Sequence, residues 1–330
     1  MHHKLIILLV VTQCLFGCQE RKNLAMLDLI PSSDQTEEIK ERFPILVSED
    51  YGETWKPITK ELPADMQASF VEQKENKLVL ATDNLTLFMS MADQSKWVSI
   101  GDHLPNKKIN ALHVSGKNIY VGVYRRGIFV TKDEGMTWKP LNYDLQSLDV
   151  QSILKLEEQL FIGTDEGVFI LEDNMKSWKK TKLDAQVVSL YSYNKRIVAR
   201  TNQGTSISNN SGENWNWIRQ EGAVHYTHNI EERIIELLLN GDVVYSDDWG
   251  ESWKQTYYEP RAESYVYEIV EAGTYQLMSN NYGILRSSDK GVTWEHIFKT
   301  ESLVFFDLIT IGDKVYGVTR SWDEYRKRRN

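Results

Sequence analysis

The sequence predicts an all-β fold, a β-propeller with seven four-stranded blades. Three observations predict it: tryptophans recur at nearly constant intervals, short apolar runs separated by turn residues fill each interval, and the two ends of the chain complement each other. Of the 330 residues, 41% are hydrophobic and 11% aromatic, and the net charge is −9, so the chain can bury a large core. These values disfavour disordered, collagen-like and coiled-coil chains.

The first forty residues predict a processing signal followed by a tether. Residues 1–4 are basic, and residues 5–16 form an apolar run that is too short to cross a bilayer. The segment LFGC, which ends at Cys18, resembles the bacterial lipobox, and an ordinary secretory signal is the alternative. We expect residues 1–17 to be a signal peptide, Cys18 to be the lipidated residue, and residues 18–40 to be a flexible tether.

An internal repeat dominates the chain from residue 41 onward. Seven of the ten tryptophans are separated by 42, 41, 40, 37, 38 and 41 residues. They are Trp55, Trp97, Trp138, Trp178, Trp215, Trp253 and Trp294. The eight residues that end at each tryptophan, here called a box, are also alike: SEDYGETW, SMADQSKW, TKDEGMTW, LEDNMKSW, SNNSGENW, SDDWGESW and SSDKGVTW. Such regularity indicates a repeat architecture.

Each box predicts a hairpin turn that ends in a buried tryptophan. Its aspartate can accept hydrogen bonds from backbone N–H groups one to three residues on, and its glycine permits a positive φ. The four complete boxes contain Asp50, Gly52 and Trp55; Asp133, Gly135 and Trp138; Asp248, Gly250 and Trp253; and Asp289, Gly291 and Trp294. Because turn chemistry accounts for these carboxylates, we expect them to be structural rather than catalytic or metal-binding.

Three boxes are degenerate. Ala92 and Gln94 replace the aspartate and glycine of the second box, Met175 replaces the glycine of the fourth, and Asn210 replaces the aspartate of the fifth. All three keep the tryptophan, which indicates that its burial matters more to these turns than the carboxylate does.

The segments between boxes predict successive antiparallel strands. The third unit has apolar runs at 109–114, 119–124 and 128–131, with turns between them, and an outgoing strand from Trp138. Four strands in forty residues are typical of a propeller blade. No unit contains a helix-period segment long enough for a helical solenoid.

The ends of the repeat predict how the ring closes. Only one strand, residues 43–47, precedes the first box, whereas two strands without a box, within 303–311 and 314–319, follow the last. Pairing them completes a seventh blade and removes two exposed sheet edges. We therefore expect the propeller to span residues 41–322. Residues 323–330 form a basic tail, which either contacts anionic lipid or a partner, or stays solvated.

The box resembles the Asp-box, or BNR repeat, of sialidase-like β-propellers, with the pattern Ser/Thr-x-Asp-x-Gly-x-Thr-Trp. In such propellers ligands bind around the central channel, on the face opposite the boxes. This resemblance implies a ligand site among Arg125, Arg126, Tyr258, Arg261, Tyr282, Arg320 and Trp322. We also expect His225 and His228 in a connection between blades on that face, as a solvated or satisfied pair rather than metal ligands.

A sialidase-like glycoside hydrolase is the alternative function. Sialidases clamp the substrate carboxylate with three arginines, the first of which lies in an Arg-Ile-Pro motif on an inner strand of the first blade. Here the corresponding residues 303–319 contain no arginine, and the similar letters at 42–45 precede an outer strand.

Other chemistry has little support in the sequence. The acidic balance argues against a nucleic-acid partner, and no phosphate-binding loop, zinc motif or nucleophile elbow is present, so we expect no metal and no cofactor. Asp-box propellers include non-catalytic proteins, such as photosystem II assembly factors and the sortilin ectodomain, that grip polypeptides. The sequence therefore predicts a lipid-anchored, non-catalytic scaffold in the bacterial cell envelope that binds a protein, peptide or glycan.

Overall fold

The computed structural model describes residues 45–321 except 59–61, 63–67, 83–85, 92–95, 107, 173–175, 221–223, 231, 239–241, 257–265, 281 and 300–303. Residues 41–330 form one compact unit. The described part of this unit contains strands and turns and no helix, as the short apolar runs predict.

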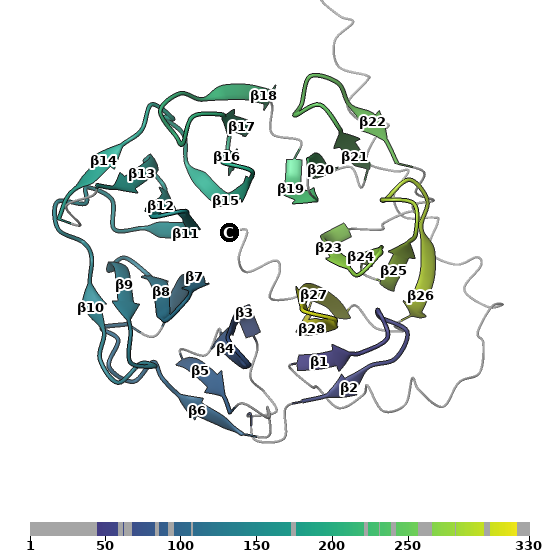
Figure 1. The fold of residues 1–330 in the computed structure, drawn as a ribbon, viewed down its shortest axis with the longest axis horizontal. Helices are drawn as coiled ribbons and strands as arrows, with labels where there is room; N and C mark the ends of the chain where they lie inside the picture. The colour runs from purple at the N-terminus through teal and green to yellow at the C-terminus, as the bar shows by residue number, and fades with distance from the viewer. Residues whose placement is uncertain are drawn as a thin grey trace, which may run out of the picture. The chain divides into compact units, whose positions relative to one another are not determined.

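The strands form seven antiparallel, four-stranded sheets arranged as a ring of blades (Figure 1). From the innermost strand outward, blade 1 is β27 (Val304–Ile311), β28 (Lys314–Ser321), β1 (Ile45–Ser48) and β2 (Lys56–Pro57). Blade 2 is β3 (Ala68–Lys74), β4 (Lys77–Thr82), β5 (Thr86–Ser90) and β6 (Trp97–Ser99); blade 3 is β7 (Ile109–Ser115), β8 (Asn118–Val123), β9 (Gly127–Thr131) and β10 (Lys139–Pro140). Blade 4 is β11 (Val150–Leu156), β12 (Gln159–Thr164), β13 (Gly167–Leu171) and β14 (Trp178–Lys180); blade 5 is β15 (Val187–Tyr193), β16 (Arg196–Thr201), β17 (Gly204–Ser208) and β18 (Asn216–Gln220). Blade 6 is β19 (Val224–Ile230), β20 (Arg233–Leu238), β21 (Val243–Ser246) and β22 (Lys254–Gln255); blade 7 is β23 (Val266–Ala272), β24 (Tyr275–Asn280), β25 (Gly283–Ser287) and β26 (Glu295–Lys299).

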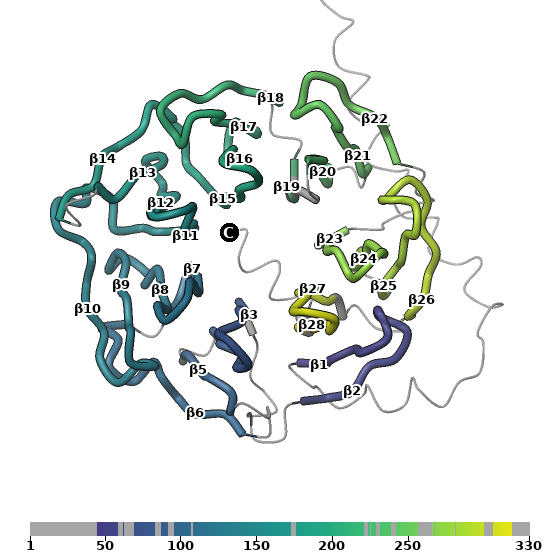
Figure 2. Tube along the Cα trace, viewed as in Figure 1, coloured from purple at the N-terminus to yellow at the C-terminus, as the bar shows by residue number. Residues whose placement is uncertain are grey.

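The two ends of the repeat meet in blade 1, as predicted. β1 pairs with β28 in antiparallel register, with Ile45 opposite Val318 and Ser48 opposite Val315. The trace in Figure 2 shows the first and last strands of the propeller side by side in this blade. The predicted seven-bladed ring and its mode of closure are therefore confirmed.

The hydrophobic core is divided among the junctions between blades. Seven clusters of buried apolar side chains are present in the described residues, and each joins two neighbouring blades. The junction of blades 3 and 4 buries Tyr120, Phe169 and Trp178 with many aliphatic residues. Of these clusters, the one at the junction of blades 5 and 6 has the fewest buried members among the described residues, namely Val198, Ile207 and Ile234, with Ile218, Trp249 and Trp253 packed against them. Ring stability is thus spread over seven unequal seams.

Each complete box turn is held by a small network of side-chain bonds. In the first box the Ser48 hydroxyl donates to Asp50 Oδ1 (2.8 Å) and accepts from the N–H of Gly52 (2.8 Å), which has φ +93°. The N–H of Thr54 donates to Asp50 Oδ1 (2.9 Å), and its hydroxyl donates to Oδ2. In the other complete boxes, the backbone N–H four residues after the aspartate likewise donates to its Oδ1 atom; these aspartates are Asp133, Asp248 and Asp289. The principal N–H donor therefore lies four residues on, rather than the predicted one to three, because the glycine lets the chain fold back over the carboxylate.

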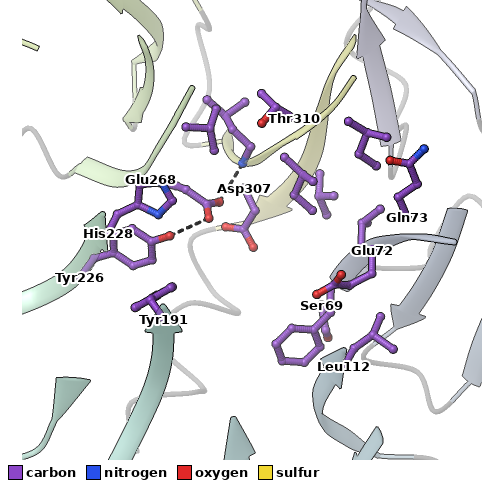
Figure 3. A pocket seen from close by; sticks show the side chains of 17 residues that line it. Ser69, Glu72, Gln73, Leu112, Tyr191, Tyr226, His228, Glu268, Asp307 and Thr310 are labelled. Atoms are coloured by element: carbon purple, nitrogen blue, oxygen red, sulfur yellow. Dashed lines mark hydrogen bonds between the residues drawn. The ribbon is translucent and has the colours of Figure 1, made fainter. Parts of the chain in front are cut away.

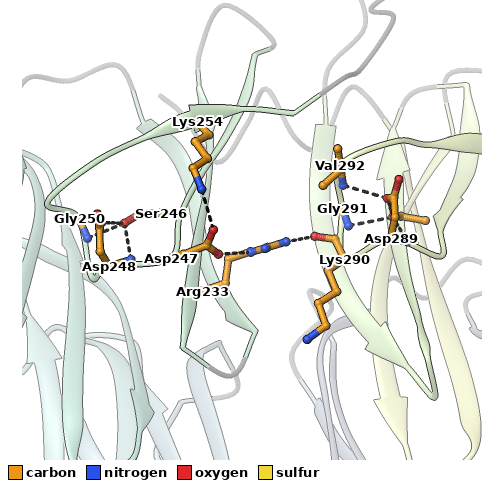
Figure 4. A network of polar contacts seen from close by, with 11 residues as sticks. Arg233, Ser246, Asp247, Asp248, Gly250, Lys254, Asp289, Lys290, Gly291 and Val292 are labelled. Carbon is orange, nitrogen blue, oxygen red and sulfur yellow. Dashed lines mark hydrogen bonds and ion pairs between the residues drawn. The ribbon is translucent and has the colours of Figure 1, made fainter.

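The boxes also join neighbouring blades. The indole N–H of Trp138 donates to the carbonyl of Ile100 in the preceding blade (2.9 Å). Figure 4 shows Arg233 of β20 reaching the backbone carbonyl of Lys290, in the box of blade 7, while its Nε donates to Asp247 (2.7 Å). The box is therefore both a hairpin turn and a contact between blades.

Candidate functional site

A cavity of about 570 Å³ lies at the centre of the ring (Figure 3). Its lining comes mainly from the inner strands β3, β7, β15, β19, β23 and β27. The apolar part of the wall is formed by Phe70, Val71, Leu112, Val270, Leu308, Ile309, Ile311 and Val318. A concave, largely apolar space with a few polar groups is the usual form of a ligand site.

Three carboxyl side chains face this cavity from consecutive blades. Glu268 comes from blade 7, Asp307 from blade 1 and Glu72 from blade 2. Glu268 accepts hydrogen bonds from the Tyr226 hydroxyl (2.9 Å) and the N–H of Leu308 (2.8 Å), as Figure 3 shows. The described lining includes no lysine or arginine, so carboxyl groups outnumber basic groups among the side chains that line the cavity.

Aromatic rings form the wall of the cavity that blades 5 and 6 contribute. The rings of Tyr226 and His228 stack with centroids 6.1 Å apart, and Tyr191 meets both edge-on, at 6.5 and 6.0 Å. Burial lowers the pKa of His228 to about 4, so the imidazole is neutral at pH 7. Its Nδ1 atom is buried and has no hydrogen-bond partner among the described residues.

Glu72 occupies a different environment from an ordinary surface glutamate. Burial raises the pKa of its carboxyl to about 7. A hydrogen bond from the backbone of Val114 has the opposite, smaller effect and lowers this pKa. Nearby, Nδ1 of His113 lies 3.9 Å from Glu72 Oε1, and burial lowers the pKa of His113 to about 4. About one third of the Glu72 side chain is exposed (35%), so a proton on this carboxyl can exchange with solvent.

The inner strands position these side chains by a recurring irregularity. In blades 2–7 the register shifts between the first and third residues of the inner strand, whereas β27 pairs without a shift. A β-bulge of this kind re-aims the following side chains. Glu268, the third residue of β23, then bonds the N–H of Leu308 in the next blade, and His113 of β7 accepts from the N–H of Lys155 (3.3 Å). The cavity side chains therefore also satisfy the edge N–H groups of neighbouring inner strands.

The predicted ligand residues fall into separate parts of the molecule. Arg125 and Arg126 are exposed in the turn between β8 and β9, where the Arg125 guanidinium lies 5.0 Å from the Tyr124 ring centroid. Tyr282 lies in the turn between β24 and β25. These turns belong to blades 3 and 7, which are not neighbours in the ring, and none of the three residues lines the cavity.

The remaining predicted residues lie wholly or partly outside the part of the chain that the structure describes. Tyr258, Arg261, Trp322 and Cys18 lie outside the described residues, and of Arg320 only the backbone, in β28, is described. The prediction for His225 and His228 was wrong: both lie within the inner strand β19 rather than in a connection between blades. The polar run that contains them is held as a strand by pairing with β20.

The cavity residues were not among the predicted ligand residues, which the sequence places at hairpin tips and connections between blades. A pattern in the sequence could have identified them: polar or aromatic residues stand at the third or fifth position of the inner strands. They include Glu72, Tyr191, Tyr226, His228 and Glu268. The described residues contain no group of three or more His, Cys, Asp or Glu side chains suited to a metal ion. Among the residues searched, no helix is long and apolar enough for a membrane span.

Comparisons with known proteins give structural neighbours only. No family model and no curated protein matches the sequence. A structure of YCF48 bound to D1 peptide has a TM-score of 0.62 at 16% identity, covering 78% of this chain and 96% of that one. The extracellular domain of a hybrid two component system from B. thetaiotaomicron has a TM-score of 0.56 at 14% identity, covering 71% of this chain and 33% of that one. An ancestral GH74 enzyme has a TM-score of 0.55 at 14% identity, covering 81% and 40%. At these identities the comparisons support the propeller fold, whose neighbours include both binding proteins and an enzyme.

Proposed function

We propose that this protein is an exported, lipid-anchored, non-catalytic scaffold that binds a polypeptide at the central channel of its propeller. The observation that carries the proposal is the cavity at the ring centre, where side chains from six inner strands converge. The neighbour solved with a bound peptide is a precedent for such binding on this fold. Protein and peptide partners are favoured over a glycan by that precedent and by the mixed apolar and acidic lining.

Affinity capture with the tagged full-length chain tests this function. Incubation with a solubilised envelope extract should co-purify a defined polypeptide, identified by mass spectrometry. The predicted ligand residues Arg125 and Arg126 are tested in the same assay by the double variant Arg125→Glu/Arg126→Glu, which should weaken capture if the ligand extends from the cavity over blade 3. The matched control is Lys117→Glu/Lys132→Glu, which reverses two exposed charges at the opposite end of the same blade. Absence of any specific polypeptide would contradict the proposal.

We propose further that the anchor is a lipid on Cys18 and that the boxes are Asp-boxes of the sialidase-like group. Metabolic labelling with an alkyne fatty acid should tag the wild type and the Cys14→Ser variant. It should not tag the Cys18→Ser variant. Equal labelling of both serine variants would contradict lipidation at Cys18.

A glycoside hydrolase is the second candidate, and Glu72 is the observation that favours it. A carboxyl with a pKa of about 7 in a cavity with two other carboxyl groups has the character of a general acid. Against a sialidase, the described lining offers no arginine to clamp a substrate carboxylate. Turnover of a fluorogenic glycoside panel that disappears in Glu72→Gln would establish the enzyme and displace the scaffold.

A further inference from the structure

We propose that a cationic and aromatic patch on blade 3 binds an acidic segment of the bound polypeptide. The inference rests on the proposed function and gives one part of the ligand a chemical class. The patch lies on the face opposite the boxes, in the turn between β8 and β9 and in the two connections that flank blade 3. This surface, here called the blade 3 patch, consists of Lys108, Tyr124, Arg125, Arg126, Tyr143 and Leu148.

Hydrogen bonds join the three segments that form the blade 3 patch. The N–H of Tyr124 donates to the carbonyl of Lys108 (2.9 Å), and a glycine N–H in the same turn donates to the carbonyl of Leu148 (3.0 Å). The Asn142 side chain donates to the carbonyl of Arg126 (2.8 Å). The turn between β8 and β9 is therefore fixed against both flanking connections, so the side chains of the patch form one surface.

Cationic groups without a carboxylate partner are the first argument. Lys108, Arg125 and Arg126 are exposed, and none of them forms an ion pair with any residue that the structure describes. Elsewhere in the ring, by contrast, Arg233 is paired with a carboxylate at 2.7 Å and Arg286 with another at 2.8 Å. Because the planar guanidinium matches the geometry of a carboxylate, the arginines of the patch can bind acidic side chains of a ligand.

The aspartates in the two flanking connections are bonded to other groups. Asp102 accepts from the Ser99 hydroxyl (2.8 Å), and Asp144 accepts from a backbone N–H of blade 4 (2.8 Å). Asp149 accepts from two side-chain amides (3.1 and 2.7 Å). These carboxylates reduce the net charge of the region, so we expect recognition through direct ion pairs rather than through a long-range field.

Backbone conformation is the second argument. Arg125 (φ +52°) and Tyr143 (φ +29°) have a positive φ, which is unfavourable for residues with a large side chain. All other described non-glycine residues with a positive φ lie in boxes or in turns between the first two strands of a blade, which are on the opposite face. Strained backbone is concentrated at functional sites. On the face opposite the boxes, the strain in the described residues is therefore confined to the blade 3 patch.

Exposed aromatic and apolar surface is the third argument, and it favours a polypeptide over a small anion. The Tyr143 side chain is 54% exposed and that of Leu148 is 40% exposed. The Tyr124 ring orients two of the cations, with its centroid 4.4 Å from the Lys108 ammonium and 5.0 Å from the Arg125 guanidinium. Tyrosine and arginine are among the residues that contribute most to binding energy at protein interfaces. An acidic segment that also contains an apolar residue is complementary to both parts of the patch.

Binding of short blocked peptides to the full chain in detergent tests the inference. The probe is an N-acetylated, C-amidated heptapeptide, Gly-Glu-Glu-Leu-Glu-Glu-Gly, and its control has glutamine in place of all four glutamates. We expect the glutamate peptide to bind at least tenfold more tightly by isothermal titration calorimetry, since several exposed ion pairs add up to such a difference. Its affinity should fall as ionic strength rises. No saturable binding of the glutamate peptide, or equal affinity for the two peptides, would overturn the inference.

Matched variants locate the site on blade 3. The double variant Arg125→Gln/Arg126→Gln should weaken binding of the glutamate peptide at least tenfold. The control Lys117→Gln/Lys132→Gln also removes two exposed charges, from the opposite end of the same blade, and should bind like the wild type. Unchanged affinity in the arginine variant, or an equal loss in the control, would overturn the inference. Thermal melting checks folding, and if the double variant unfolds, the single variants Arg125→Gln and Arg126→Gln give the same comparison.

Competition with a soluble lipid headgroup tests the other anionic occupant. Glycerophosphoglycerol at the concentration of the glutamate peptide should leave peptide binding unchanged, because it has a single charge and no apolar side chain. Displacement of the peptide at equal concentration would assign the patch to lipid headgroups and overturn the inference.

The outcome is distinguishable from failure of the proposed function. If the wild type captures a polypeptide from the envelope extract but does not bind the glutamate peptide, the scaffold stands and the acidic segment is wrong. If the wild type captures no polypeptide at all, the proposed function itself fails.

Discussion

At the scale of residues, the box turns show how a short motif fixes a backbone. One hydroxyl donates to the aspartate and accepts from the glycine N–H, and the carboxylate accepts two further bonds from the residue four positions on. The hydroxyl of Thr137, with that of Thr131, lowers the pKa of Asp133 to about 2. These carboxylates are fully engaged in local structure, which agrees with a structural role.

Replacing Trp138 with alanine should destabilise the propeller by about 3–5 kcal/mol, the usual cost of truncating a packed tryptophan. The indole contributes to the junction of blades 2 and 3 and donates to the carbonyl of Ile100. Chemical denaturation measures the change. The control is Met136→Ala in the same turn, whose side chain is 72% exposed and should leave stability unchanged. A loss below about 1 kcal/mol for the tryptophan variant would contradict its role.

Glu72→Gln should change how stability depends on pH. Because the pKa of Glu72 is about 7 in the folded chain and near 4.5 when unfolded, the folded state retains a proton that the unfolded state releases between these values. The contribution of Glu72 to stability is therefore complete below pH 4.5 and lost as pH rises through 7. Thermal melting should show that the melting temperature of the glutamine variant rises relative to that of the wild type from pH 5 to pH 8. The exposed Glu75→Gln should show no such gain, and parallel curves for Glu72→Gln and wild type would refute the assignment.

At the scale of elements, the seams between blades differ in chemistry. The junction of blades 5 and 6 buries the Glu236 carboxylate completely, with Arg219 paired to one oxygen and the Thr205 hydroxyl donating to the other (2.6 Å). Burial raises the pKa of Glu236, while its bonds to Thr205 and Arg219 lower it. Among the described residues, the smallest cluster of buried apolar side chains also lies at this seam.

Arg219→Met should therefore destabilise the protein by about 3–5 kcal/mol, because it removes the arginine that is paired with the buried Glu236 carboxylate. The double variant Arg219→Met/Glu236→Leu should recover much of that loss, since both charges are removed. Lys195→Met breaks an exposed pair with Glu157 (2.9 Å) and should cost at most about 1 kcal/mol. Urea unfolding of the wild type, the two single variants and the double variant measures these changes in the free energy of unfolding. A double variant no more stable than Arg219→Met would show that the pair is not the source of the loss.

The sequence predicted most elements because they are local. The runs 109–114, 119–124 and 128–131 correspond to β7, β8 and β9 to within one residue at every boundary, since alternation and turn residues act over a few positions. β19 was missed because its polar sequence becomes a strand only through pairing with β20. The bulges that follow the first residue of the inner strands have no consistent residue signature, so the direction of their side chains was not predictable.

The cavity was not predictable for a different reason. Glu72, Glu268 and Asp307 are separated by up to 235 positions in the chain, and only closure of the ring brings them to one space. Charge and composition can be read from a sequence, but the convergence of six inner strands on one cavity depends on the complete assembly of blades.

At the scale of the whole molecule, the ring depends on one non-local pairing. β1 is held in blade 1 by four register pairs with β28, which lies at the other end of the propeller sequence. Without this pairing, β1 and β2 would be an isolated two-stranded hairpin, which is marginal in water. The cavity and its lining exist in this form only while blade 1 is complete, because Asp307 belongs to the strand beside β28.

Hydrogen–deuterium exchange of the full chain tests this closure most directly. The account predicts that the amides of residues 45–48 exchange as slowly as those of β9 and β13, the equivalent third strands of blades 3 and 4, to within about tenfold. Exchange of residues 45–48 as fast as that of the exposed turn at Gly116 and Lys117 would contradict a ring closed by β1 and β28.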